Sequence, residues 1–535
     1  MSPKGEPLKV SIGALDELDP DTFDWAAYRG TYKGRALITR LAAIPTLVLS
    51  SKTKPSQKAL ALARAAALQA IPVLKAETWD TQLYGRLCRQ IEATLTGATY
   101  DESMEVDEGE GRAGPEAEGG RDVAWVAEAS AAAKQEHQRL QVELNGYLSN
   151  LIKESIRLSY LSLAELAIKT GHLGEALKSY SQMREYSSGP AHQVQLGLGI
   201  LEAALMFNDT TPLAGNISKV DASLDRLHPV SSTSSSAVQV NEDMTATQLA
   251  ASRENVARSQ AVRRSVTAKL RVSRAILALA DGSYATAVRE LANVEDEGGL
   301  GDWEGAAISS ADMAFIAAMG ALASQSRGYI RRVLLDRGSF RAALADRPWV
   351  IDLVTAFVDA QYGAALQLVQ QAQPHMLLNP WLAPHAEDLA KKIRTRALVQ
   401  YLEPFASVRV AAMAEAFNTS EDEMMAELCK LAEEGTVDVR IDAVDRLVTI
   451  RERDPRQEAF QGGAKTGQDI ANTVQTALFR MRLKEAGVVV DPTPPQAKES
   501  RKEWWREHRG DRSDRDRSSH GVGAGGAPLL GALSS

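Results

Sequence analysis

Residues 387–451 read EDLAKKIRTRALVQYLEPFASVRVAAMAEAFNTSEDEMMAELCKLAEEGTVDVRIDAVDRLVTIR, and this stretch decides the fold. Its apolar side chains recur first at helical spacing, then in two shorter helical stretches after Pro404, and finally at every second position. The second helix is predicted over 407–417. The third is predicted to start at Ser420, which has the Ser-x-x-Glu spacing of a capping box with Glu423.

Beyond Gly435, which ends the third helix, the alternating positions predict a β-hairpin. Its strands are predicted over 436–441 and 447–451, joined by the polar turn 442–445. The apolar positions of the two strands are Val437, Val439, Ile441, Val448 and Ile450. Three helices followed by a two-stranded wing make a winged helix.

The charge of the third helix distinguishes between two functions of a winged helix. A nucleic-acid reader needs Lys, Arg or neutral donors on that helix to meet phosphates and base edges. Here Lys430 is outnumbered by acidic residues, which are Glu421, Asp422, Glu423, Glu427, Glu433 and Glu434. The sequence therefore favours a packing module whose wing offers unpaired backbone groups to a neighbouring chain, as in strand addition.

Two runs in this region resemble the PCI module that is shared by the proteasome lid, the COP9 signalosome and the initiation factor three scaffold. They are LLNPWLAPHAEDLAKKIRTRALVQYLEPF at 377–405 and MAEAFNTS at 413–420. The signalosome pattern matches best, and it is also matched at 24–41 and 150–186. The resemblance covers most of the chain up to about Phe460.

The resemblance implies a non-catalytic scaffold subunit of a hetero-oligomeric complex in nucleus and cytoplasm. Its expected partners are other PCI subunits, MPN subunits and, as substrates of the complex, cullin-RING ubiquitin ligases. In this family the cullin modifier is removed by a different subunit through an H-x-H zinc motif, which is absent here. We therefore expect no catalytic, cofactor-binding or metal-binding residues. The alternative is a proteasome lid subunit of the same architecture.

The composition further limits the possible fold classes and binding functions. A chain of 535 residues is expected to divide into two or three units, and its Ala- and Leu-rich runs with 5% aromatic residues indicate a mostly α-helical protein. A net charge of -8 argues against general binding of nucleic acid or anionic membranes. No eighteen consecutive residues are apolar, so no membrane span is expected.

An internal repeat predicts how the helices before the winged helix are arranged. GHLGEALK at 171–178 and GSYATAVR at 282–289 share one layout, each after an apolar helix. Small residues at such positions allow two antiparallel helices to cross closely, as in tetratricopeptide repeats. We expect a tetratricopeptide-like array that forms a right-handed solenoid.

The chain is predicted to divide as follows. The segments are a flexible leader (1–22), an N-terminal helical region (23–99), an acidic disordered insertion (100–123), a repeat region (124–335) with a flexible insertion (230–250), a PCI domain (336–460), a C-terminal helix (466–487) and a disordered tail (491–535).

Two surfaces are expected to hold the subunit in its complex. One is the wing, by pairing with a strand of another PCI subunit. The other is the amphipathic helix 466–487, whose apolar stripe cannot stay exposed. It is expected to fold back on its own chain or to join a bundle from several chains, and we predict the bundle. The predicted interface residues are Val437, Val439, Ile441, Val448, Ile450, Ile470, Val474, Leu478 and Met481.

Overall fold

The structure, a computed structural model, describes residues 12–20, 23–51, 55–96, 114–227, 246–450 and 455–487. Residues 1–450 form one unit and residues 451–535 a second. The first unit begins with a group of short and long helices. They are η1 (Ile12–Glu17), α1 (Trp25–Gly30), α2 (Gly34–Ser50), α3 (Gln57–Glu77) and α4 (Thr81–Thr96).

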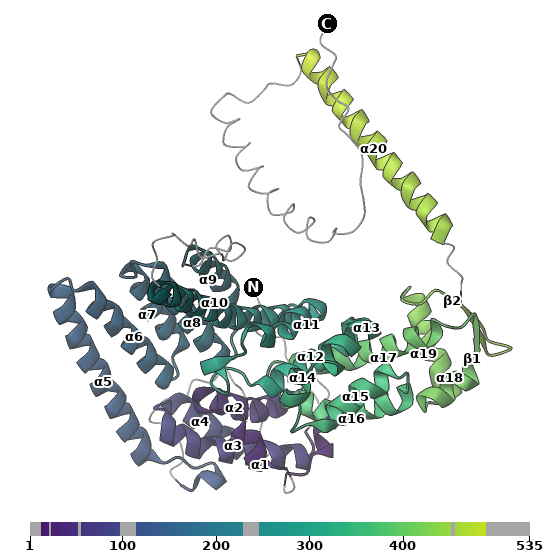
Figure 1. Ribbon diagram of the computed structural model, residues 1–535. Coiled ribbons are helices and arrows are strands. Elements are labelled where there is room, and N and C mark those ends of the chain that lie inside the picture. The colour runs from purple at the N-terminus through teal and green to yellow at the C-terminus, as the bar shows by residue number, and fades with distance from the viewer. Residues whose placement is uncertain are drawn as a thin grey trace. The chain divides into compact units, whose positions relative to one another are not determined.

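A helical array follows, in which each helix from α5 to α12 packs on the next, as Figure 1 shows. Its elements are η2 (Glu116–Glu118), α5 (Val123–Ser149), α6 (Lys153–Lys169), α7 (Leu173–Glu185), α8 (Pro190–Met206), α9 (Leu213–Leu227), α10 (Ala246–Ala280), α11 (Tyr284–Ala292), η4 (Glu295–Glu297), η5 (Gly301–Trp303) and α12 (Ser310–Ser324). The predicted fold class, helical repeats followed by a winged helix, is confirmed.

The repeated sequence motif marks the turns of two helical hairpins in this array. Gly171 and Gly282 lie in the α6–α7 and α10–α11 turns. Their φ angles of +88° and +72° are ones that residues with a side chain rarely adopt. Ala176 and Ala287 follow on the next helices and are buried where the helices cross. The small side chains therefore permit the close helix packing that the repeat predicts.

The first helices dock on the array and on the helices beyond it through buried polar contacts. Arg35 forms a buried ion pair with Asp80, at 2.6 Å. The backbone N–H of Trp79 donates to the carbonyl of Lys169 at 3.0 Å, and the Lys169 ammonium lies 3.5 Å from the centre of the Trp79 ring. These contacts fix the end of α3 against the end of α6.

A second buried cluster joins α2 to α12. Asp312, only 1% exposed, pairs with Arg40 of α2 and, at 3.2 Å, with Arg347, and it accepts a 2.7 Å hydrogen bond from the Tyr32 hydroxyl. Burial raises the pKa of Asp312, but the two arginines outweigh burial and hold it below its usual value. The carboxylate is therefore ionised where it joins two parts of the chain that are distant in sequence.

Helices between the array and the winged helix complete the core. They are α13 (Arg327–Ile330), the π-helix η6 (Arg331–Leu335), α14 (Gly338–Ala343), α15 (Pro348–Val358), α16 (Tyr362–Leu377), η7 (Ala383–His385) and α17 (Ala386–Leu402). Tyr362 of α16 stacks on Phe417 with ring centres 5.5 Å apart. Gly363 is required beside it, because a Cβ there would lie 2.9 Å from the Ala416 carbonyl oxygen.

The winged helix contains one more strand than the sequence predicts. Its elements after α17 are β1 (Ser407–Arg409), α18 (Val410–Phe417), α19 (Glu421–Glu433), β2 (Val439–Asp442) and β3 (Leu447–Ile450). The helix predicted over 407–417 is wrong in its first three residues. They form β1 because Val408 alternates with exposed neighbours and buries its side chain against β3.

The end of α18 and the start of α19 are both capped. Asn418 ends α18 in the left-handed conformation, with φ of +54°. Ser420 and Glu423 then form the predicted capping box at the start of α19. The hairpin strands differ slightly from the predicted ranges, since they cover 439–442 and 447–450 around a turn at 443–446.

Two segments predicted as loose are partly ordered. In the leader, residues 12–17 form η1, and Leu15 is fully buried against α3 and α16. In the acidic insertion, residues 114–123 are ordered because Lys75 pairs with Glu116 at 2.5 Å and with Asp122 at 2.8 Å. The predicted flexible insertion 230–250 ends earlier, since α10 begins at Ala246. The remainder of these segments and the tail 491–535 lie outside the described residues.

Within the described residues, one helix, α3, is long and apolar enough to cross a membrane by composition. Half of its apolar window is buried inside the chain. Leu62, Ala66 and Ala70 are fully buried there, between α2 and α4. This burial is typical of a core helix. A core helix can be as long and as apolar as a membrane-spanning one.

Candidate assembly interface

The three strands of the winged helix form one antiparallel sheet in the order β1-β3-β2. On one side of β3, the N–H of Ile450 donates to the carbonyl of Ala406 at 2.9 Å, just before β1. In an antiparallel ladder, backbone groups of successive residues point to opposite sides. Thr449 therefore points its N–H and C=O to β2, where its register partner is Arg440.

The same alternation identifies which residues of β2 face away from the sheet. Arg440 uses its backbone groups on β3, so those of Val439 and Ile441 point to the open edge. Such unpaired N–H and C=O groups are a template for an added strand. The β2 edge thus offers the backbone of Val439 and Ile441 to another chain.

The apolar side chains of the hairpin do not lie on that edge. Val448 is fully buried within this chain, and its role as an interface residue stays a prediction. Val437, Val439, Ile441 and Ile450 are half-buried and pack against the core of the first unit. Alternation correctly groups these residues on one face, but this face turns toward the helices. These half-buried side chains therefore offer little surface to a partner, whereas Val444 in the hairpin turn is 91% exposed.

The second predicted surface is the apolar stripe of α20 (Pro455–Glu485), in the second unit. This helix starts eleven residues before the predicted 466–487. Its predicted interface side chains are all more than half exposed within this chain: Ile470 60%, Val474 52%, Leu478 53% and Met481 66%. Phe460 and Phe479 are also exposed, and sequence reasoning did not include them. Within this chain the stripe has the exposure that a docking surface requires.

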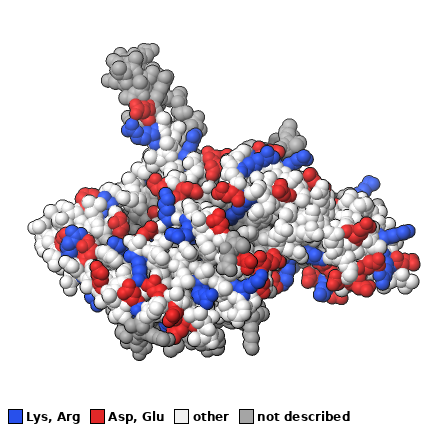
Figure 2. Space-filling model, turned by 90° about the horizontal axis from the view of Figure 1, so that it is seen from below, with Lys and Arg blue, Asp and Glu red and all other residues white. Residues whose placement is uncertain are grey.

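The acidic helix α19 is partly neutralised by arginines of the same domain. Arg394 of α17 makes two parallel hydrogen bonds to the Glu427 carboxylate, at 2.7 and 2.8 Å. Arg446, in the hairpin turn, pairs with Glu421 and, at 3.3 Å, with Asp422. Acidic and basic side chains are also mixed over the face shown in Figure 2. Arg394 and Arg446 thus have carboxylate partners, which leaves fewer cations for a phosphate backbone.

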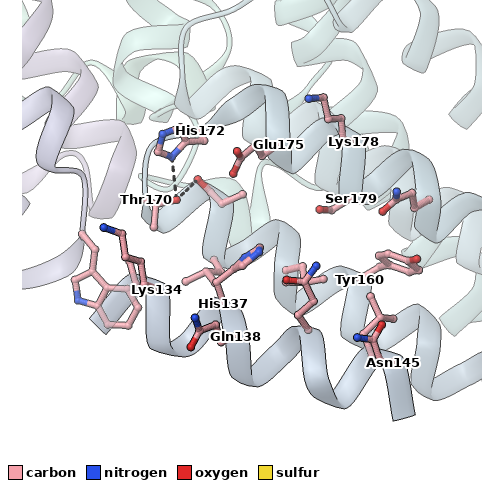
Figure 3. A pocket seen from close by; sticks show the side chains of 18 of the residues that line it. Lys134, His137, Gln138, Asn145, Tyr160, Thr170, His172, Glu175, Lys178 and Ser179 are labelled. Atoms are coloured by element: carbon pink, nitrogen blue, oxygen red, sulfur yellow. Dashed lines mark hydrogen bonds between the residues drawn. The ribbon is translucent and has the colours of Figure 1, made fainter. Parts of the chain in front are cut away.

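A groove of about 770 Å³ lies between α5 and the hairpin α6–α7. Figure 3 shows Lys134 and His137 on the α5 side, with His172, Glu175 and Lys178 on the α7 side. The lining mixes polar side chains with leucines of α5 and α6. Sequence reasoning missed this groove, because its lining comes from three helices and carries no motif.

Histidines and carboxylates do not gather as metal ligands within the described residues. His385 precedes α17 and lies 3.3 Å from the Tyr284 hydroxyl, which donates to Asp388 at 2.6 Å. Burial lowers the pKa of His385, although Asp388 acts in the opposite direction. This contact joins α11 to α17. Among the described residues, His385 has no group of further histidine, cysteine or carboxylate side chains around it that could hold a metal ion.

Comparisons with known proteins match both parts of this architecture. The family described as 26S proteasome subunit RPN7 matches residues 122–333, and the PCI domain family matches residues 369–452, from α16 through the wing. The C-terminal part of the first unit is therefore similar to PCI domains. The matched range begins within α16 and lies inside the predicted 336–460, whose bounds stay a prediction.

Similar proteins extend the match beyond the PCI domain. COP9 signalosome complex subunit 1 of Arabidopsis thaliana is 28% identical over 364 residues, which are 68% of this chain and 74% of that protein. Subunit 1b of Drosophila melanogaster is 26% identical over 69% of this chain and 64% of its own length. A 26S proteasome non-ATPase regulatory subunit 6 homolog of Arabidopsis thaliana is 24% identical over 161 residues, 30% of this chain. The predicted resemblance to the signalosome members of the PCI family is confirmed.

Proposed function

We propose that this chain is a non-catalytic scaffold subunit of a COP9 signalosome. In this proposal it supports the deneddylation of cullin-RING ubiquitin ligases by holding other PCI and MPN subunits in place, in both nucleus and cytoplasm. The observation that carries it is the extent of similarity, since 364 residues align with a protein named COP9 signalosome subunit 1 and only 161 with a proteasome subunit.

The alternative is a subunit of the proteasome regulatory lid. It is favoured by the match of the proteasome subunit RPN7 family to residues 122–333. Both candidates use the same helical array and PCI domain, so the fold alone does not distinguish them.

Purification of the tagged full chain from its own cells, with identification of the proteins that accompany it, separates the two. We expect PCI and MPN subunits of a signalosome. Recovery of proteasome lid subunits in their place would favour the alternative. The chain alone should not cleave a neddylated cullin, whereas the purified complex should. Metal-dependent cleavage by the isolated chain would contradict the scaffold role.

Two proline variants test whether the β2 edge pairs with another PCI subunit. Val439→Pro removes an N–H from the open edge, so the hairpin should form while co-purification with PCI partners falls. Arg440→Pro removes an N–H that faces β3, so it should loosen the hairpin itself. Co-purification and thermal unfolding of both variants are compared with those of the wild type. If Val439→Pro assembles like the wild type, β2 is not the contact.

A further inference from the structure

A second groove, of about 610 Å³, is lined by α7, α8 and α9. Helix α8 packs on both α7 and α9, so it forms the floor while the other two helices form the walls (Figure 1). Each helix lines the groove with residues three or four positions apart, which is the spacing of one helix face. We call this space the α8 groove.

Three cations line the α8 groove. Arg184 comes from α7, and Lys219 and Arg226 come from α9, and all three side chains are exposed. In the part of the chain that the structure describes, none of them pairs with a carboxylate, and Arg226 donates to the Ala222 carbonyl of its own helix at 3.1 Å. Within the described residues, no Asp or Glu contributes to the lining. The walls of the groove are therefore positively charged.

The acidic side chains of the same helices lie on other faces. Asp221 of α9 pairs with Arg274, and Asp225 pairs with Arg263 at 3.1 Å, so both carboxylates are held by α10. Glu175 of α7 lines the groove beside α5 instead. The two that remain, Glu185 and Glu202, are not part of the lining either. The three cations thus face the α8 groove without a carboxylate on the same face of the helices.

Apolar side chains lie between the charged walls. Leu177 and Ile200 are half-buried and line the groove, and the ring of Tyr180, only 3% exposed, packs beside them. Aliphatic and aromatic surface of this kind gains free energy when an apolar side chain covers it. The α8 groove therefore combines an apolar base with cationic walls.

Two side-chain amides of the lining keep hydrogen-bonding groups available. The Oε1 of Gln193 accepts a hydrogen bond from the Ser223 hydroxyl at 3.1 Å, which leaves its NH₂ group as a donor. The NH₂ group of Asn216 donates to the Pro212 carbonyl at 2.8 Å, which leaves its own carbonyl as an acceptor. One donor and one acceptor are what the carbonyl and N–H of a peptide backbone require.

The spacing of the cations favours an extended ligand. Lys219 and Arg226 are two helical turns apart, which is about 10 Å along α9. An extended peptide advances by about 3.3 Å per residue, so carboxylates three residues apart can meet both cations. A single small anion cannot meet both at once.

We propose that the α8 groove binds an acidic peptide segment of a partner protein in an extended conformation. The carboxylates of the peptide lie against Arg184, Lys219 and Arg226, an apolar side chain covers Leu177 and Ile200, and its backbone bonds to the two amides. Charge-assisted hydrogen bonds between arginine and carboxylate are strong and directional. A nucleic acid fits less well, because it has no apolar side chain for the base and the net charge of -8 opposes a long polyanion.

This binding goes beyond the scaffold function, since it uses neither β2 nor α20. It is independent of whether the chain belongs to a signalosome or to a proteasome lid. Helical repeat arrays present extended surfaces to partners, and the α8 groove is a part of such a surface.

The first test is fluorescence anisotropy with the purified full chain at low salt. The labelled peptide has Glu at every third position, one central Leu and Gly elsewhere. We expect binding that weakens as salt is added. Replacing every Glu by Gln should abolish binding, and replacing the central Leu by Ser should weaken it about tenfold, because an apolar contact is lost. Absence of binding, equal binding of the Ser peptide, or equally tight binding of single-stranded DNA of similar length would overturn the proposal.

Charge reversal in the protein locates the binding site. Arg184→Glu with Lys219→Glu changes one exposed side chain on each wall and should weaken peptide binding more than tenfold. The matched control is Lys134→Glu with Lys178→Glu, which makes the same change of charge at exposed positions in the groove beside α5. The control should bind the peptide like the wild type, and both variants should keep the wild-type circular dichroism spectrum. If the control loses as much binding as the first variant, or if the first variant binds like the wild type, the α8 groove is not the site.

Discussion

Replacing Asp312 by alanine is expected to destabilise the first unit by about 3 to 5 kcal/mol, which is typical of removing one partner of a buried ion pair. The substitution leaves Arg40 buried without its carboxylate and Tyr32 without its acceptor. Because the folded-state pKa of Asp312 is lowered, its stabilising contribution is present above the unfolded-state pKa and is lost as the pH falls through the folded-state value. At pH 7 the full effect should appear.

Differential scanning calorimetry of the full-length variant checks this expectation, with Asp302→Ala as the control. Asp302 also has a cationic neighbour, Lys269 at 3.8 Å, but its side chain is 98% exposed. An exposed pair contributes at most about 1 kcal/mol, so the control should unfold near the wild-type temperature. If the two variants unfold at the same temperature, the cluster does not join α2 to α12 in the way described.

Introducing aspartate at both Leu478 and Met481 is expected to abolish assembly with partner subunits. Both side chains are exposed within this chain, so the variant should keep its own helical content. In a shared bundle they would be buried, and an unpaired charge there costs several kcal/mol. Loss of assembly without loss of folding is therefore the expected combination.

Co-purification with partner subunits measures assembly, and circular dichroism measures the helical content of the variant. The control is Gln468→Asp with Gln475→Asp, which adds the same charge to the polar face of the same helix. The control should assemble normally. Normal assembly of the Leu478 and Met481 variant would mean that α20 is not an interface.

The sequence predicted the winged helix well because its local signals agree. Helical spacing, the capping box at Ser420 and the alternation after Gly435 all occur within one stretch and require no distant partner. β1 was not predicted because its pairing partner is distant in sequence. Three residues become a strand only because Ser407 pairs with Thr449, and nothing near residue 407 reveals that partner.

The candidate site was predicted less completely than the fold. Alternation indicates which wing side chains share a face, but only packing shows that the face of Val448 turns inward. Leu15 falls in the predicted flexible leader, whereas η1 packs on α3 and α16 with Leu15 fully buried and Ala14 and Leu18 partly buried. The groove beside α5 combines residues of three consecutive helices. Their residues carry no common motif.

The strand order β1-β3-β2 also bears on how many copies can join in a row. The two outer strands differ in length and in what flanks them, since β1 leads directly into α18 whereas β2 follows α19. A neighbour that adds its own unlike edge to β2 makes a head-to-tail contact and leaves β1 available. Repetition of this contact does not give a two-fold pair but a ring if its rotation closes, or an open series of subunits if it does not. The stoichiometry of such a series is then set by the chains at its two ends.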